Sequence, residues 1–227
     1  MQQLSTDELG QLLFSLEEST REEALRWLKL RHEDRAICHL SSALENTSPG
    51  GFFYGLVEAL GAFGDAQALP ALTKAYLRAR QDLPRLALLR AIGALEGEGS
   101  EAFLLSVLHP QSSWNLRIPA LELLLFRKQT NVLPQLLDAF VTSPLPERLA
   151  VLLQRAALQN PSWEVPATLT LRLMLGDPLS EAHIRAAIKV FHAVGDASVI
   201  PLIESWSAAI PALRRGCSLT IRQLKKR

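Results

Sequence analysis

Histidine and cysteine are the residue types in this sequence best suited to binding metals or acting as nucleophiles. Five histidines and two cysteines are spread over 227 residues. A metal site needs three or four converging ligands. His32 and His39 are seven residues apart, but the turn predicted between them means that they do not share one continuous helix face. Cys38 and Cys217 lie too far apart in sequence to indicate a metal cluster or a disulfide framework. We therefore predict no metal site.

Motifs for acid–base, nucleophilic or phosphate chemistry are also missing from the sequence. It has no phosphate-binding glycine loop after a strand, no serine-hydrolase elbow and no zinc-protease helix. Glu122, Asp138 and Glu204 form no acid–base pair by spacing, although a pair formed across distant segments stays open. Neighbouring arginines would lower the pKa of the Cys217 thiol if it were exposed. We predict no catalytic residue and no cofactor, which favours a non-catalytic protein and leaves enzyme activity open.

Composition and charge are those of an ordinary globular protein. Apolar residues make up 48% and charged residues 21% of the chain. No apolar run approaches the roughly 18 residues of a membrane span, and no secretory signal is visible, so we expect a cytoplasmic protein. The formal net charge of +1 hides an asymmetry. Residues 1–46 carry five basic and nine acidic side chains, and residues 209–227 carry six basic and no acidic ones.

The elements that would position any site recur along the chain. Residues 60–72 (LGAFGDAQALPAL) return in degenerate form as residues 191–203 (FHAVGDASVIPLI). A marker proline recurs at multiples of about 32 residues, with a last step of about 35. The marker prolines are Pro70, Pro134, Pro166 and Pro201. Apolar residues upstream of each marker follow the three-and-four spacing of a buried helix face, and no strand pattern competes.

The repeats predict an all-α protein, an α-α superhelix of about six helical hairpins with a capping helix at each end. We expect a single domain over residues 1–227. Residues 1–19 form the N-terminal cap helix, residues 20–208 the six repeats, and residues 209–227 a C-terminal cap helix with a basic tail. Such a stack shares one continuous interior, because no single hairpin buries its apolar face alone.

Turn residues between the helices predict how each hairpin bends. Gly64 suits a left-handed residue at the end of a helix, and Asp65 suits a cap for the next helix. Gly195 and Asp196 predict the same turn in the last repeat. Cys38 occupies the marker position in the first repeat, where we expect it to be small, apolar and buried.

The Gly-Asp-Ala-Gln-Ala-Leu-Pro-Ala-Leu pattern of residues 64–72 resembles HEAT repeats, in particular the short HEAT-like variety of phycobilisome lyases. The resemblance covers about residues 20–208. It implies an α-solenoid whose second helices line the concave face, and it brings no catalytic residue. Many members are binding platforms, whereas some assist chromophore attachment or act on DNA.

The resemblance places candidate binding residues one, four, five and eight positions after each marker. From these positions the predicted concave face takes Lys74, Arg78, Gln135, Asp138, Ser205 and Trp206. Small, polar and occasional aromatic groups of this kind suit a protein or peptide partner. Trp206 could instead belong to the core.

Three functions follow in order of preference. The first is a non-catalytic protein-binding scaffold or adaptor that uses the concave face. The alternative, implied by the resemblance alone, is a bilin lyase or chaperone-like protein that assists chromophore attachment. Nucleic-acid binding comes last, because the predicted face lacks the continuous row of basic side chains that follows phosphates. We expect no membrane partner, and the oligomeric state stays open.

Overall fold

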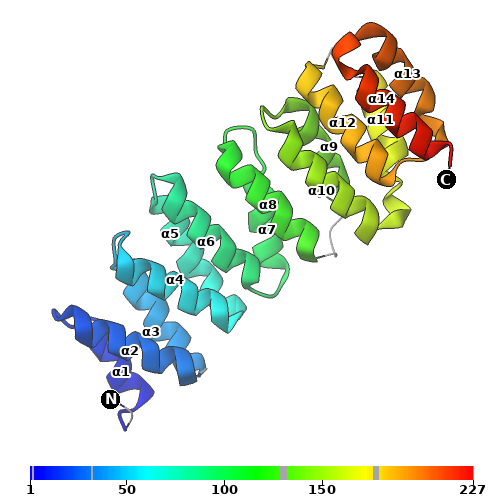
Figure 1. The fold of residues 1–227 in the computed structure, drawn as a ribbon. Coiled ribbons are helices and arrows are strands. Elements are labelled where there is room, and N and C mark those ends of the chain that lie inside the picture. The colour runs from blue at the N-terminus through cyan, green and yellow to red at the C-terminus, as the bar shows by residue number, and fades with distance from the viewer. Residues whose placement is uncertain (2, 32, 128–131, 176–178, 227) are drawn as a thin grey trace. The chain divides into compact units, whose positions relative to one another are not determined.

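The computed structural model describes residues 1, 3–31, 33–127, 132–175 and 179–226, and no strand occurs in these ranges. They form fourteen α-helices joined by short turns and 3₁₀ segments (Figure 1). The fold is an all-α solenoid of helical hairpins, as the sequence predicts. The chain divides into two compact units, Met1–Phe126 and Arg127–Arg227. The single domain expected from the sequence stays a prediction.

In the first unit, helices of the same kind pack side by side in two rows. Its helices are α1 (Thr6–Leu12), α2 (Glu18–Arg31), α3 (Asp34–Glu45), α4 (Gly51–Phe63), α5 (Leu69–Arg78), α6 (Asp82–Ala94), α7 (Glu98–Val107) and α8 (Trp114–Arg127). The first helices of successive hairpins, α2, α4 and α6, form one row, and α1, α3 and α5 form the other. Tyr76 of α5 meets Phe103 of α7 edge to face at 5.1 Å, which continues the second row.

The second unit repeats this arrangement. Its helices are α9 (Leu133–Thr142), α10 (Pro146–Gln159), α11 (Val165–Leu175), α12 (Glu181–Val194), α13 (Ile200–Ala209) and α14 (Arg214–Leu224). First helices α10, α12 and α14 pack in sequence, and the second helix α9 packs against α11. The ranges predicted for the cap helices, 1–19 and 209–227, contain α1 and α14, and their capping role stays a prediction. The predicted tail residue Arg227 lies outside the described residues.

Local sequence explains the bend of the second hairpin. Gly64 ends α4 in the left-handed conformation, with φ of 70°, which costs glycine little. Asp65 then accepts a hydrogen bond from the amide of Gln67 at 2.7 Å. Pro70 follows in the first turn of α5, where its missing amide hydrogen leaves no helix bond unmade.

The last repeat keeps the capping aspartate but not the left-handed glycine. Asp196 accepts from the amide of Ser198 at 2.8 Å. Gly195 has φ of −73° and ψ of 167°, so the predicted left-handed turn is wrong there. A Cβ at this position would lie 2.5 Å from the carbonyl oxygen of Phe191. Space, rather than backbone handedness, therefore favours glycine at 195.

The marker position faces solvent. Pro70, Pro134 and Pro201 are exposed, and the core is formed by the residues that follow, such as Ala71 and Leu72. Cys38 at the same position is also exposed, so its predicted burial is wrong. The reason is that a first-turn proline needs no packing partner, so it marks the start of a helix rather than its buried face.

Ion pairs join helices of the same row across successive hairpins. The first unit contains Asp7–Arg35, Lys29–Glu58 and Glu45–Lys74, each at 2.9 Å. The second contains Asp138–Arg172 at 2.9 Å and Glu147–Lys189. Each exposed pair adds little stability, but together they favour one register between neighbouring hairpins.

Candidate binding surface

The solvent face of the second helices differs between the two units. In the first unit, Lys74 donates to the Glu45 carboxylate at 2.9 Å. Arg78 donates to the carbonyl oxygens of Leu44 at 3.1 Å and Glu45. These carbonyls end α3, where a cation is favoured by the helix dipole. Both predicted binding cations are therefore bonded to α3, and the α3–α5 surface is covered by polar contacts.

In the second unit the corresponding surface opens into a groove between α9 and α11, with a volume of about 470 Å³. The residues that line this α9–α11 groove are Leu133, Pro134, Leu137, Asp138, Thr168, Leu171 and Arg172. Asp138 and Arg172 form an ion pair from one helix to the other at 2.9 Å. The groove therefore combines aliphatic walls with one acidic and one basic side chain.

Beside the groove, α11 buries a different face from α5 relative to the marker proline. In α5 the buried positions include Ala71 and Ala75, one and five residues after the marker. In α11 the buried aliphatic residues are Val165 and Leu169, so the helix is turned relative to its marker Pro166. Leu171 is consequently 59% exposed. Exposed aliphatic side chains are common singly, but several beside a groove indicate a contact surface.

Met174 extends the same surface by one turn. It is 67% exposed on α11, three residues after Leu171. A flexible thioether side chain adapts to differently shaped apolar partners. Gln135 is exposed on α9. Neither side chain lines the groove itself.

The two predicted binding residues of the last repeat lie on α13 and do not line the groove. Ser205 donates its hydroxyl to the carbonyl oxygen of Leu202 at 2.7 Å. The Trp206 ring stacks on Phe191 of α12, with centroids 6.2 Å apart and planes 22° apart. Trp206 is half-buried, because one side of its indole covers the core. It is therefore partly a core residue, an alternative that the sequence left open.

The predicted set thus belongs to three helices in two units, and only Asp138 of that set lines the groove. Sequence reasoning missed Leu171, Arg172 and Met174. The spacing rule used for the other repeats would have found two of them, because Leu171 and Met174 lie five and eight positions after the marker Pro166. The rotation of α11 was not visible, because it depends on how neighbouring helices pack.

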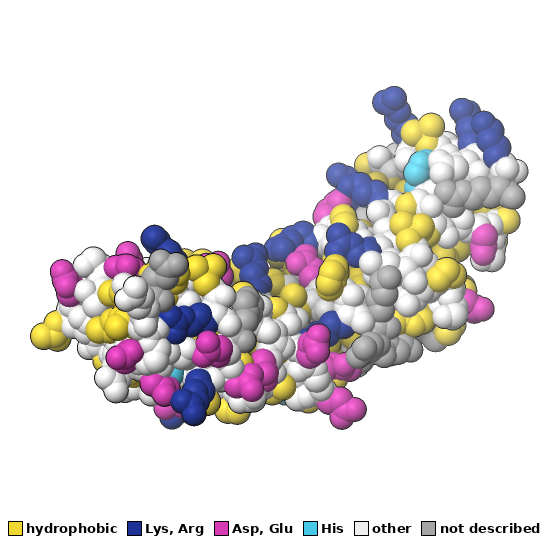
Figure 2. Space-filling view, turned by 90° about the horizontal axis from the view of Figure 1, so that it is seen from below, with side chains coloured by type: hydrophobic (Ala, Val, Ile, Leu, Met, Phe, Trp, Pro, Cys, Tyr) yellow, Lys and Arg dark blue, Asp and Glu magenta, His cyan; other side chains and the backbone are white. Residues whose placement is uncertain are grey.

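Other chemistry is limited in the described part of the chain. No three histidine, cysteine or carboxylate side chains converge there in the manner of a metal site. Within the same ranges, no helix has the length and apolar character needed to cross a membrane. On the face shown in Figure 2, acidic, basic and hydrophobic side chains are interspersed. Such a mixture is typical of protein contacts rather than of a phosphate-following row of cations.

A family model and one solved structure with a TM-score above 0.5 agree with this architecture. Residues 54–78 match the model of the PBS lyase HEAT-like repeat. The complex of CpcE and CpcF of phycocyanin lyase from Nostoc sp. PCC7120 superposes with a TM-score of 0.53 at 21% identity, covering 88% of this chain and 81% of that one. Human deoxyhypusine hydroxylase in complex with glycerol gives a TM-score of 0.47 at 15% identity, covering 98% and 96% of the two chains. No curated protein matches the sequence.

The identity to the lyase structure is low, so its similarity bears on the fold alone. The repeat model covers α4 from its fourth residue, the Gly64–Asp65 turn and all of α5. These are the elements whose sequence resembles HEAT repeats most closely. The protein is therefore a helical-repeat protein in which residues 54–78 match a PBS lyase HEAT-like repeat.

Proposed function

We propose that this protein is a non-catalytic scaffold that binds another protein, and that the α9–α11 groove is its main contact. The observation that carries the proposal is the exposure of Leu171 and Met174 beside a groove of about 470 Å³. Burying two such side chains contributes on the order of 1.5–3 kcal/mol each. That is a substantial part of the binding energy of a transient complex.

The chemistry of the groove selects the kind of partner. Aliphatic side chains from two helices receive an apolar side chain of the partner, and the Asp138–Arg172 pair lies among them. Polar groups at the edge of an apolar patch fix orientation rather than supply most of the affinity. A protein segment with one or two large apolar anchors and a neighbouring polar group fits this arrangement.

Site-specific crosslinking tests the proposal. A photoreactive amino acid replaces Leu171 in the full-length protein, expressed in the native source, and captured proteins are identified by mass spectrometry. The matched control places the same group at Leu158, which is 74% exposed on α10 in the same unit but outside the groove. We expect one partner to be captured at position 171 and not at position 158.

Substitution then confirms or contradicts the contact. Leu171→Glu should weaken binding of that partner by about tenfold or more, because it places a charge in an apolar contact. Leu158→Glu should leave the affinity unchanged. Equal capture at both positions, or equal affinity of both variants, would contradict the proposal.

A second candidate is assistance in attaching a bilin chromophore, and the match of residues 54–78 to the PBS lyase HEAT-like repeat is what favours it. Coexpression with a bilin and a chromophore-accepting apoprotein tests this function. Red or green absorbance that copurifies with the protein would support it. A colourless protein and an unmodified apoprotein would leave the scaffold function as the better account.

A further inference from the structure

The turns that lead to the first helix of each hairpin in the first unit border a groove. Three of these turns are residues 13–17, 46–50 and 79–81. Residues of the first and second turns line a hollow of about 450 Å³, and residues of the second and third line another of about 490 Å³. Thr47, Ser48 and Phe53 line both hollows, which together are called the turn groove below. A surface that extends along three turns fits an extended chain better than a compact ligand.

One end of the turn groove, beside the turn between α5 and α6, is cationic. Arg78 and Arg80 line this end, and none of the described residues that line it is acidic. Arg78 donates to the carbonyl oxygens of Leu44 and Glu45, which are neutral acceptors and leave its charge uncompensated. The Glu45 carboxylate itself pairs with Lys74. Arg80 is exposed and forms no ion pair within the described ranges, so this end favours an anionic group.

The other end of the turn groove, beside the turn between α1 and α2, is aromatic. Phe14 lines it and is 51% exposed. The guanidinium of Arg21 lies over the ring of Phe52, 5.3 Å from its centroid. Arg21 also donates to the carbonyl oxygens of Ser15 at 2.9 Å and Leu16 at 3.1 Å, which holds this wall in place. A wall that is already ordered costs little further entropy when a ligand binds.

The wall of the turn groove also carries polar groups that suit a peptide backbone. The side chains of Ser48 and Gln81 are exposed, and neither forms a hydrogen bond with another described residue. An extended chain carries unpaired N–H and C=O groups, which such side chains can bond. A nucleic acid fits less well, because it needs cations along its whole length and Glu18 lines the aromatic end.

We propose that the turn groove binds an extended acidic segment of another protein. An acidic side chain of the segment lies beside Arg78 and Arg80, and a large apolar side chain contacts Phe14 at the other end. Charge complementarity selects this occupant, because the cationic end has two arginines and no carboxylate among the described residues that line it. The site belongs to the first unit and is independent of the α9–α11 groove, so it adds a second contact to the proposed scaffold.

Selection of random phage-displayed peptides on the immobilised full-length protein tests the proposal. The enriched peptides should combine Asp or Glu with a large apolar residue. One of them is then synthesised, and its affinity is measured by fluorescence anisotropy. Arg80→Glu should weaken its binding by about tenfold or more, because like charges then oppose each other. The matched control Arg90→Glu makes the same charge change at an exposed position of α6 outside the turn groove and should bind like the wild type.

Three further comparisons locate the peptide. Replacing its acidic residue by lysine should weaken binding to the wild type and restore binding to Arg80→Glu, since both charges are then reversed. Phe14→Ser should weaken binding several-fold by removing the apolar contact, whereas Leu77→Ser, at a residue of α5 that is 71% exposed outside the groove, should not. Leu171→Glu should leave the affinity unchanged, which separates this test from that of the α9–α11 groove.

Two outcomes would overturn the proposal. They are a selection that enriches no acidic peptide, and an acidic peptide that binds Arg80→Glu as tightly as the wild type. A single-stranded RNA oligonucleotide that binds through Arg80 where acidic peptides do not would reject a protein segment as the occupant. Self-association that is lost in Arg80→Glu, again without peptide binding, would make the occupant a second copy. Circular dichroism of each variant shows whether its helices remain folded.

Discussion

At the scale of single residues, the two cysteines show how environment sets thiol chemistry. Cys38 lies exposed in the first turns of α3, whereas Cys217 is buried on the inner face of α14. Burial raises the pKa of the Cys217 thiol above its ordinary value. Arg214 and Arg215 lie next to it in sequence, but their exposed side chains do not compensate for the burial. Cys217 is therefore a packing residue.

Thiol labelling of the native protein should separate the two cysteines. Cys38 should react at once with an aromatic disulfide reagent, and Cys217 on the order of a hundredfold or more slower, because it reacts only after local unfolding. Absorbance of the released thiolate measures both rates. Cys38→Ser should remove the fast phase alone, and a fast phase that survives this substitution would contradict the assignment.

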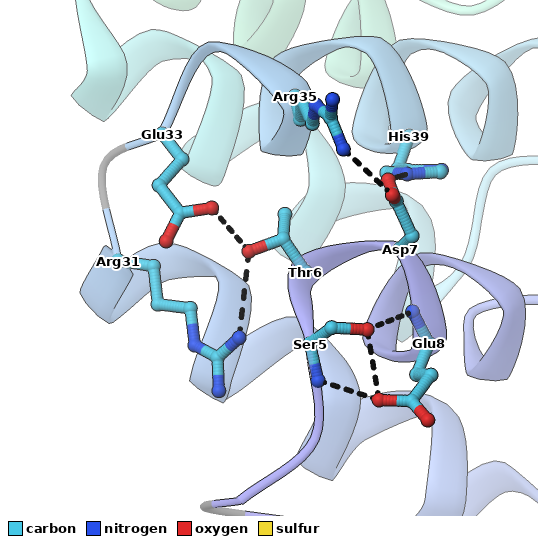
Figure 3. A network of polar contacts seen from close by, with 8 residues as sticks. All are labelled: Ser5, Thr6, Asp7, Glu8, Arg31, Glu33, Arg35 and His39. Atoms are coloured by element: carbon cyan, nitrogen blue, oxygen red, sulfur yellow. Dashed lines mark hydrogen bonds and ion pairs between the residues drawn. The ribbon is translucent and has the colours of Figure 1, made fainter.

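At the scale of elements, the docking of α1 depends on polar contacts with α3 and the turn before it (Figure 3). Ser5 and Glu8 form a capping box that starts the helix. Asp7 accepts from Arg35 at 2.9 Å and lies 2.9 Å from the Nε2 atom of His39. The hydrogen bond from His39, followed by the charge of Arg35, holds the pKa of Asp7 below its usual value of 3.8. The fold therefore favours the charged carboxylate.

This shift predicts how acid affects the protein. The stabilisation from Asp7 is complete above its unfolded pKa and is lost as the pH falls through the lower folded pKa. At neutral pH the wild type should therefore unfold at a higher midpoint urea concentration than Asp7→Asn. The difference between the two midpoints should vanish towards about pH 2. The control Glu204→Gln alters an exposed carboxylate of α13 and should show no such loss. A wild-type advantage that is constant with pH would contradict the role of Asp7.

At the scale of the whole molecule, each unit is stabilised by contacts between neighbouring hairpins. α14 buries Cys217, Thr220 and Leu224 against the last hairpin. Gln223 donates to the carbonyl oxygen of His192 at 3.0 Å. Close approach between helices is supported by small residues, as where Gly61 of α4 meets Ala91 of α6.

Removing α14 should expose this interior. A chain that ends after residue 212 should unfold at a temperature several degrees lower and bind an apolar dye, because the covered face of α12 becomes accessible. The control lacks only residues 225–227 and should keep the wild-type unfolding temperature. Calorimetry and dye fluorescence measure both effects. An unchanged unfolding temperature after loss of α14 would show that the helix does not act as a cap.

The sequence by itself determined that the protein is all-α and that its helices repeat as hairpins. These properties depend on local interactions, since helical spacing, the Asp65 cap and the first-turn Pro70 act within a few residues. Only the tertiary structure decided which face each helix buries. Cys38 is exposed and α11 presents Leu171 and Met174 because neighbouring helices set the rotation of each helix. The groove and the pairing of Asp138 with Arg172 follow from that rotation, which repeat spacing does not encode.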